Sequence, residues 1–170
     1  MITTQTQTTV TVYELLARAS DYPAAEMLAS VRECVAALKA QRSPAARHMA
    51  RFRLFVEQTE LSALEELYAA TFDLQPVCYP YIGYQLFGDT YKRGEFLARL
   101  NARYRENGVV VQGELPDHLS LILQYLACTW DYELVIEGVV PALERMIEQL
   151  KGNPYQDLLR AILIVLRERG

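Results

Sequence analysis

The stretch NPYQDLLRAILIVL, residues 153–166, contains both of the signals that predict the fold. Asn153 is a good helix N-cap residue, and Pro154 follows it at the first helical position, where the missing N–H of proline costs nothing. The apolar residues recur with the i, i+3, i+4 and i+7 spacing of one helix face: Tyr155, Leu158, Leu159, Ile162, Leu163 and Leu166. The stretch therefore predicts an amphipathic helix with one buried face.

The same two signals recur along most of the chain. Ser43-Pro44 repeats the capping pair. Two further apolar stripes have helical spacing: Met27, Leu28, Val31, Cys34, Val35 and Leu38, then Ile136, Val139, Val140, Leu143, Met146, Ile147 and Leu150. Pro141 lies inside the longer stripe, and we expect it to kink or restart that helix. Because no alternating strand pattern is present, the sequence predicts an all-α fold, a single compact helical domain of about seven to nine helices.

Length and composition fit one domain. The chain has 170 residues, of which 51% are hydrophobic and 22% charged. The segment MITTQTQTTV lacks the basic start and apolar stretch of a secretory signal, so we expect residues 1–10 to be a disordered tail and residues 11–170 to form the helical domain. The longest strongly apolar run, AILIVL at 161–166, is far too short to span a bilayer. We therefore expect no membrane insertion.

Catalytic and metal chemistry find little support in the sequence. It has neither a GxGxxG nor a GxxxxGK[ST] phosphate-binding motif, and its two histidines, His48 and His118, do not follow a metal-ligand spacing. Cys34, Cys78 and Cys128 are each set among apolar residues; we expect buried, unreactive thiols without disulfides, as suits the cytoplasm. A net charge of −4 argues against nucleic acid binding. We expect no catalytic residue, no metal and no cofactor.

Two segments are more aromatic or more polar than a connection requires. Residues 71–100 are rich in tyrosine and phenylalanine and include the sequence LFGD, residues 86–89, just before a basic helix. Residues 113–127, GELPDHLSLILQYLA, place Asp117 and His118 directly before an apolar helix. Each segment could form part of a functional site, or it could have a structural role only.

The structural readings of these segments are simple. Tyr79, Tyr81 and Tyr84 would cover the core beneath a long loop. Pro116 would begin the helix, Asp117 would stabilise its first turn and His118 would lie on the surface. The basic residues at 92, 93, 99, 103 and 105 alternate with acids, which is typical of a solvated helix face.

Five stretches together resemble a known family: SDYPAAEML at 20–28, TFD at 71–73, GDTYKRGEFLARLNARYRENG at 88–108, GELPDHLSLILQYLA at 113–127 and NPYQDLL at 153–159. In this order and spacing they are similar to the nitrate reductase delta-subunit type of molybdoenzyme chaperone, within the wider NarJ/TorD/DmsD group. The resemblance implies an all-helical, cofactor-free cytoplasmic chaperone. Its partner would be the catalytic, molybdopterin-binding subunit of an oxidoreductase such as nitrate reductase. The chaperone would bind that subunit through its N-terminal peptide, often a twin-arginine leader, before cofactor insertion and complex assembly.

The family's ligand-binding surface carries over to ten residues of this chain. The predicted peptide-binding residues are Tyr79, Tyr84, Leu86, Phe87, Gly88, Asp89, Glu114, Pro116, Asp117 and His118. The tyrosines with Leu86 and Phe87 would form an apolar groove, and the acids would meet arginines of the peptide. Only Gln85 separates Tyr84 from Leu86-Phe87, and Leu115 separates Glu114 from Pro116. Both spacings favour the delta-subunit branch over the TorD/DmsD branch.

Two other functions remain open from the sequence. Asp117 and His118 with a nearby carboxylate would serve as acid–base groups in a nucleotide-binding enzyme, although no phosphate loop supports this. The chain would otherwise be a permanent adaptor subunit of a reductase complex. The free protein is expected to be a monomer or a homodimer.

Overall fold

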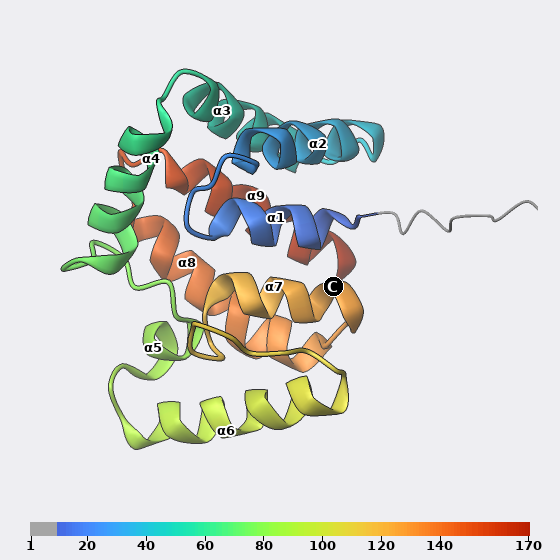
Figure 1. Cartoon of the computed structure of the whole chain (residues 1–170). Helices are drawn as coiled ribbons and strands as arrows, with labels where there is room; N and C mark the ends of the chain where they lie inside the picture. Colours follow the sequence, from blue (N-terminus) through green and yellow to red (C-terminus); the bar gives the residue numbers. More distant parts are fainter. Residues whose placement is uncertain (1–9) are drawn as a thin grey trace, which may run out of the picture.

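The computed structural model describes residues 10–170, and residues 1–9 of the expected tail lie outside the described residues. Within residues 10–170 the chain forms helices and no strand, which confirms the predicted all-α fold (Figure 1). The elements are α1 (Val12–Ser20), α2 (Met27–Ala40), α3 (Ala45–Glu57), α4 (Leu61–Tyr68), the π-helix η1 (Ala69–Asp73), α5 (Ile82–Phe87), α6 (Tyr91–Glu106), α7 (Leu119–Cys128), the π-helix η2 (Leu134–Val139), α8 (Val140–Gln149) and α9 (Tyr155–Arg169).

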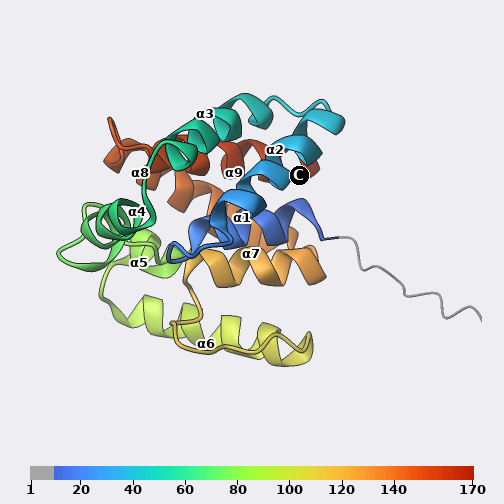
Figure 2. The same cartoon turned by 45° about the horizontal axis from the view of Figure 1, so that its top comes forward.

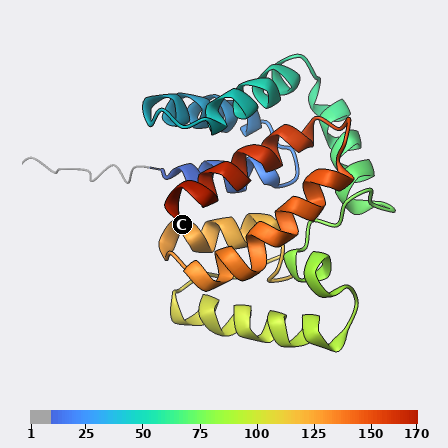
Figure 3. The same ribbon diagram turned by 180° about the vertical axis from the view of Figure 1, so that it is seen from behind.

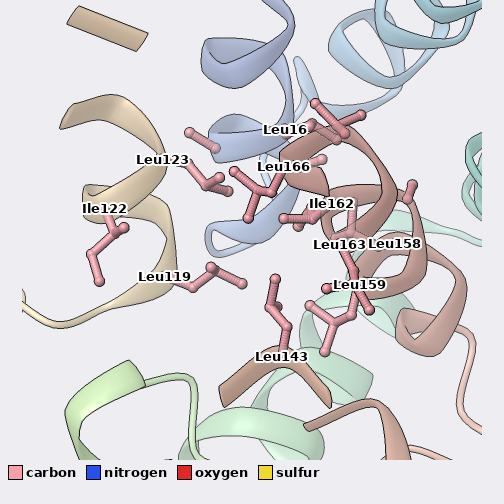
Figure 4. Close-up of a cluster of buried hydrophobic side chains, with 14 of the residues drawn as sticks. Leu16, Leu119, Ile122, Leu123, Leu143, Leu158, Leu159, Ile162, Leu163 and Leu166 are labelled. Carbon is pink, nitrogen blue, oxygen red and sulfur yellow. The ribbon is translucent and has the colours of Figure 1, made fainter. Parts of the chain in front are cut away.

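The centre of the molecule is a helix bundle. Helix α1 packs against α2 and α7, and α3 packs against α2 and α9. Seen from behind, α8 and α9 cross this side of the bundle together (Figure 3). Leucine and isoleucine side chains from α1, α7, α8 and α9 meet in its interior, among them Leu16, Leu123 and Ile162 (Figure 4). The apolar stripe that begins in NPYQDLL is therefore part of the main core.

The predicted caps form. The Asn153 side chain accepts a hydrogen bond from the Tyr155 N–H at 2.9 Å. The Ser43 hydroxyl accepts one from the Ala45 N–H at 3.2 Å. These bonds satisfy backbone donors that have no partner inside the helix.

The longer predicted stripe is interrupted as expected. Residues Leu134–Val139 form a π-helix, and α8 then begins with Pro141 in its first turn. A π-turn inserts one extra residue and so rotates the side chains that precede it. Ile136, which the stripe places in the core, is consequently exposed.

Helices α5 and α6 form an arm at one edge of the bundle (Figures 1 and 2). Helix α6 packs along α5, and its contacts with other helices are few. Among its sixteen residues, Leu100 and Tyr104 are buried. By contrast, seven of the ten residues of α7 are buried.

Two of the three cysteine predictions are confirmed. Cys34 and Cys78 are buried, and burial raises the pKa of each thiol to about 12. The prediction is wrong for Cys128, which is exposed at the last position of α7. Within residues 10–170 no helix combines the length and apolarity needed to cross a membrane.

Candidate peptide-binding site

Backbone hydrogen bonds bring the two unusual segments of the sequence together. The Ile82 N–H donates to the Asp117 carbonyl at 2.8 Å, and the Leu119 N–H donates to the Pro80 carbonyl at 2.9 Å. These bonds form an isolated antiparallel bridge between Tyr81 and His118. The aromatic loop and the residues before α7 therefore form one structural unit.

Asp117 is fully buried and paired with an arginine of α6. The Arg93 Nε donates to Asp117 Oδ2 at 3.0 Å, and Arg93 Nη2 donates to Asp117 Oδ1 at 3.2 Å. This two-point contact satisfies both carboxylate oxygens of a group that is costly to bury alone. The interpretation of Arg93 as part of a solvated helix face is wrong, because its side chain is largely covered.

The space between this ion pair and α5 is filled completely. Gly83 of α5 lies so close that a Cβ atom built on it would be 2.7 Å from Asp117 Oδ2 and 2.8 Å from Phe96 Cδ1. Real Cβ atoms are not found at such distances, so the absence of a side chain at Gly83 is required here. Gly83 was not among the predicted site residues.

His118 is the N-cap residue of α7 and is also buried. Its Nδ1 accepts a hydrogen bond from the Ser120 N–H at 3.2 Å and lies 2.9 Å from Ser120 Oγ. Burial lowers the pKa of the imidazole, against the opposing charges of Glu114, Asp21 and Asp117. The reading of His118 as a surface residue is wrong, and α7 begins at Leu119 rather than at Pro116.

Other side chains fasten the same loop. The Tyr104 hydroxyl of α6 donates to the Pro116 carbonyl at 2.7 Å, and the Tyr81 hydroxyl donates to the exposed Glu114 carboxylate at 2.7 Å. Burial, followed by Glu114, raises the pKa of Tyr81, so this phenol stays a neutral donor. The predicted residues Glu114, Pro116, Asp117 and His118 are thus tied to the aromatic loop and to α6.

The aromatic residues lie against the arginine. The Arg93 guanidinium is 5.4 Å from the Tyr81 ring centroid and 5.6 Å from that of Tyr84, within the range of cation–π attraction. The Tyr84 ring in turn is 4.1 Å, centroid to centroid, from that of Tyr79. Tyr79 remains 40% exposed, so the row of rings leads from the buried ion pair to solvent.

The end of α5 is held to the bundle. Gln85 and Gln149 of α8 exchange side-chain amide hydrogen bonds of 3.0 and 3.1 Å. Arg145 of α8 donates to the Gln85 carbonyl. Gly88 then ends α5 with φ 64° and ψ −157°, a backbone conformation that residues other than glycine rarely adopt. Gly88 and the exposed Asp89 form the turn into α6.

A pocket of about 150 Å³ lies between the arm and η2. Leu86 and Phe87 of α5, Phe96 and Leu100 of α6, and Leu134 of η2 provide its apolar wall. The lining also includes Gly138 and four charged side chains: Arg99, Arg103, Glu133 and Glu137. Of these residues, Leu86 and Phe87 were predicted from the sequence. The residues of η2 were missed because they are distant in the sequence, and those of α6 because that basic helix was interpreted as a solvated face.

One buried thiol, that of Cys78, lies in this region. Cys78, the buried thiol beside Gln85, has a pKa of about 12 and is therefore a poor nucleophile. Among residues 10–170, no group of three or more histidine, cysteine or acidic side chains is arranged to hold a metal ion. The site offers apolar and aromatic surface next to fixed charges.

Comparison with known proteins agrees with the fold. A crystal structure described as that of a candidate redox enzyme maturation protein from Archaeoglobus fulgidus superimposes with a TM-score of 0.65. The two chains are 20% identical, and the match covers 91% of each. A search of curated proteins finds no match.

The sequence model of one family, described as nitrate reductase delta subunit, matches residues 23–157. The chain therefore belongs to the nitrate reductase delta subunit family, as its motifs predicted. Family membership indicates a molybdoenzyme assembly chaperone of the NarJ type, a class of protein that is generally not catalytic.

Proposed function

We propose that this chaperone binds the N-terminal peptide of the catalytic subunit of a molybdenum oxidoreductase. It would do so in the cytoplasm, as a single domain comprising residues 11–170. Binding would keep the catalytic subunit open for insertion of the molybdopterin cofactor and for later assembly. The client would be nitrate reductase or a related enzyme, and the family membership is what supports this class of partner.

The observation that carries the proposal is the pocket between the arm and η2. An N-terminal leader combines an apolar, helix-forming stretch with basic residues, and such peptides dock their apolar face into a groove. Leu86, Phe87 and Leu134 supply apolar surface of this kind. Glu137 at the same pocket offers a carboxylate to a basic residue of the peptide, whereas Glu133 is already paired with Arg103 at 3.6 Å.

The aromatic loop supports a second part of the same contact. Tyr79 is exposed and stacked on Tyr84, and Glu114 is exposed beside Tyr81. Arginine side chains bind well to such combinations of tyrosine face and carboxylate. Asp117 and His118 would contribute indirectly, by holding Arg93 and the loop in place, because both are buried.

Affinity purification from the anaerobically grown native host tests the function. The tagged protein should recover a large molybdopterin-enzyme subunit that lacks its cofactor. Replacing Phe87, a partly exposed residue of the lining, by Glu places a charge in the pocket and should abolish this recovery. A matched control is Leu54→Glu, because Leu54 is exposed on α3, far from the arm.

Two results would contradict the proposal. Recovery of a fully assembled enzyme would favour a permanent adaptor subunit. Equal recovery by the wild-type and Phe87→Glu proteins, with both shown to be folded by circular dichroism, would remove the pocket from the binding surface.

A further inference from the structure

The pocket is too small for the peptide that it is proposed to bind. A cavity of about 150 Å³ holds one benzene-sized group, whereas a helical segment with its side chains is about 10–12 Å across. The pocket therefore accepts one large apolar side chain while its walls stay as they are. Binding a longer segment requires one wall to move.

The two walls are held very differently. Helix η2 continues directly into α8, which packs against α9 and α5. Helix α6 packs mainly along α5 and buries Leu100 and Tyr104 alone. The arm helix α6 is the wall with the smaller apolar contact.

Glycines in left-handed conformations flank this wall. Gly88 precedes α6 with φ 64°, and Gly108 follows it with φ 69°. A Cβ atom on either would meet nothing within 4 Å, so neither glycine is locked by packing. Both positions are suited to absorb backbone rotation at the two ends of one rigid helix.

Polar contacts at a few points hold α6 to the rest of the molecule. They are the two-point pair from Arg93 to Asp117, the hydrogen bond from Tyr104 to the Pro116 carbonyl, and the ion pairs from Arg103 to Asp131 at 2.8 Å and to Glu133 at 3.6 Å. The first of these is the most buried, since the Asp117 side chain is 0% exposed. A helix held by a few such contacts is either packed against the rest of the molecule or detached from it, and it does not occupy a continuous range of positions.

We propose that α6 is a hinged lid over the pocket and that the Arg93–Asp117 pair is its latch. The inference rests on the proposed function, because it assigns the lid to entry of the client peptide. Arg93 and Asp117 are then positioning residues, which control access to the pocket without touching the peptide. Releasing the latch raises the fraction of molecules that are open, and binding that requires the open form becomes faster.

Hydrogen exchange of the free, full-length protein tests the lid without any client. Arg93→Met keeps the aliphatic stem but removes the latch, and Arg167→Met is the control, because it removes an exposed ion pair to Glu144. We expect amides of residues 91–106 to exchange at least about tenfold faster in Arg93→Met, while those of α7 and α9 are unchanged. Unchanged exchange in α6, or an equal increase in all three helices, would overturn the proposal.

Asp117→Asn is a second variant, because asparagine keeps the size and one acceptor oxygen for Arg93, and the charge left without its partner is 15% exposed rather than fully buried. It should increase exchange in the same residues by a smaller factor than Arg93→Met. An increase confined to α7 would contradict the latch, since Asp117 would then serve only the start of that helix.

Binding kinetics complete the test. A synthetic peptide with the first thirty or so residues of the captured subunit should associate faster with Arg93→Met than with the wild type, by about the same factor as the gain in exchange. Equal association rates would overturn the lid. Absence of binding to either protein would contradict the proposed function instead, and the exchange result would stand on its own.

Discussion

The helix bundle and the α5–α6 arm are held together by different kinds of contact. In the bundle, side chains such as Leu16, Leu123 and Ile162 meet in a continuous apolar interior. In the arm, α6 relies on Arg93 and Tyr104 to reach across to the loop before α7. The bundle therefore resists local opening because many contacts must be lost together, whereas the arm depends on a few that are lost singly.

Truncating one leucine in each region should give the largest contrast. Leu159 of α9 is 1% exposed, and Leu159→Ala should lower the free energy of unfolding by about 2–5 kcal/mol. Leu97 of α6 is only half-buried, so Leu97→Ala should lower it by about 1 kcal/mol or less. Urea denaturation measures both. Equal losses would show that the arm is packed like the bundle.

Two glycines of the arm should respond with opposite sign. Gly83→Ala places a methyl group against Asp117 and Phe96 and should destabilise the protein by about 1–3 kcal/mol. The added methyl group of Gly94→Ala meets nothing within 4 Å in the first turn of α6, and this change should stabilise the helix by up to about 1 kcal/mol. Thermal unfolding distinguishes the two, and a stabilising Gly83→Ala would refute the tight contact.

These responses show where sequence reasoning succeeds and where it stops. Asn153 and Ser43 were predicted as caps because a cap acts on residues two or three positions away. The Arg93–Asp117 pair joins residues 24 apart, and Arg93 was read as solvated because acids alternate with it in the sequence. An available signal was the acid itself: a carboxylate directly before an almost wholly apolar helix requires a cation if it is buried.

The candidate site divides in the same way. Leu86 and Phe87 were predicted and line the pocket, but Leu134, on the opposite wall, was missed. Regular helical spacing predicted that Ile136 is buried. The π-turn at Leu134–Val139 shifts the helical register, and Ile136 is exposed. Periodicity assumes a constant number of residues per turn and therefore fails at such a turn.

The buried His118 should make stability depend on pH. Burial lowers its pKa in the folded state, so the unfolded chain binds more protons as the pH falls below about 6.5. The contribution of His118 to the free energy of unfolding should therefore be fully present at higher pH and should decline on acidification, by at most about 1.4 kcal/mol per pH unit for one proton.

His118→Asn keeps an N-cap acceptor and removes the titration. Urea denaturation between pH 7.5 and 5.5 should show a shallower decline for this variant than for the wild type. Identical slopes would show that other groups cause the pH dependence.

The smallest effect concerns a single hydrogen bond of the arm. Tyr104→Phe keeps the buried ring but leaves the Pro116 carbonyl without this donor, which should cost about 1 kcal/mol. Hydrogen exchange should localise the loss to α6 and the loop before α7. An equal loss of protection from exchange in α1 and α9 would contradict the difference between arm and bundle.

Photo-crosslinking in the native host tests the central claim most directly. A photoreactive phenylalanine analogue replaces Phe87 at the pocket in one strain and the exposed Leu54 of α3 in a control strain. Mass spectrometry should identify crosslinks from position 87, and not from position 54, to the N-terminal segment of a molybdopterin-enzyme catalytic subunit. Crosslinks that map to another part of that subunit, or that form equally from position 54, would contradict a peptide-binding site between the arm and η2.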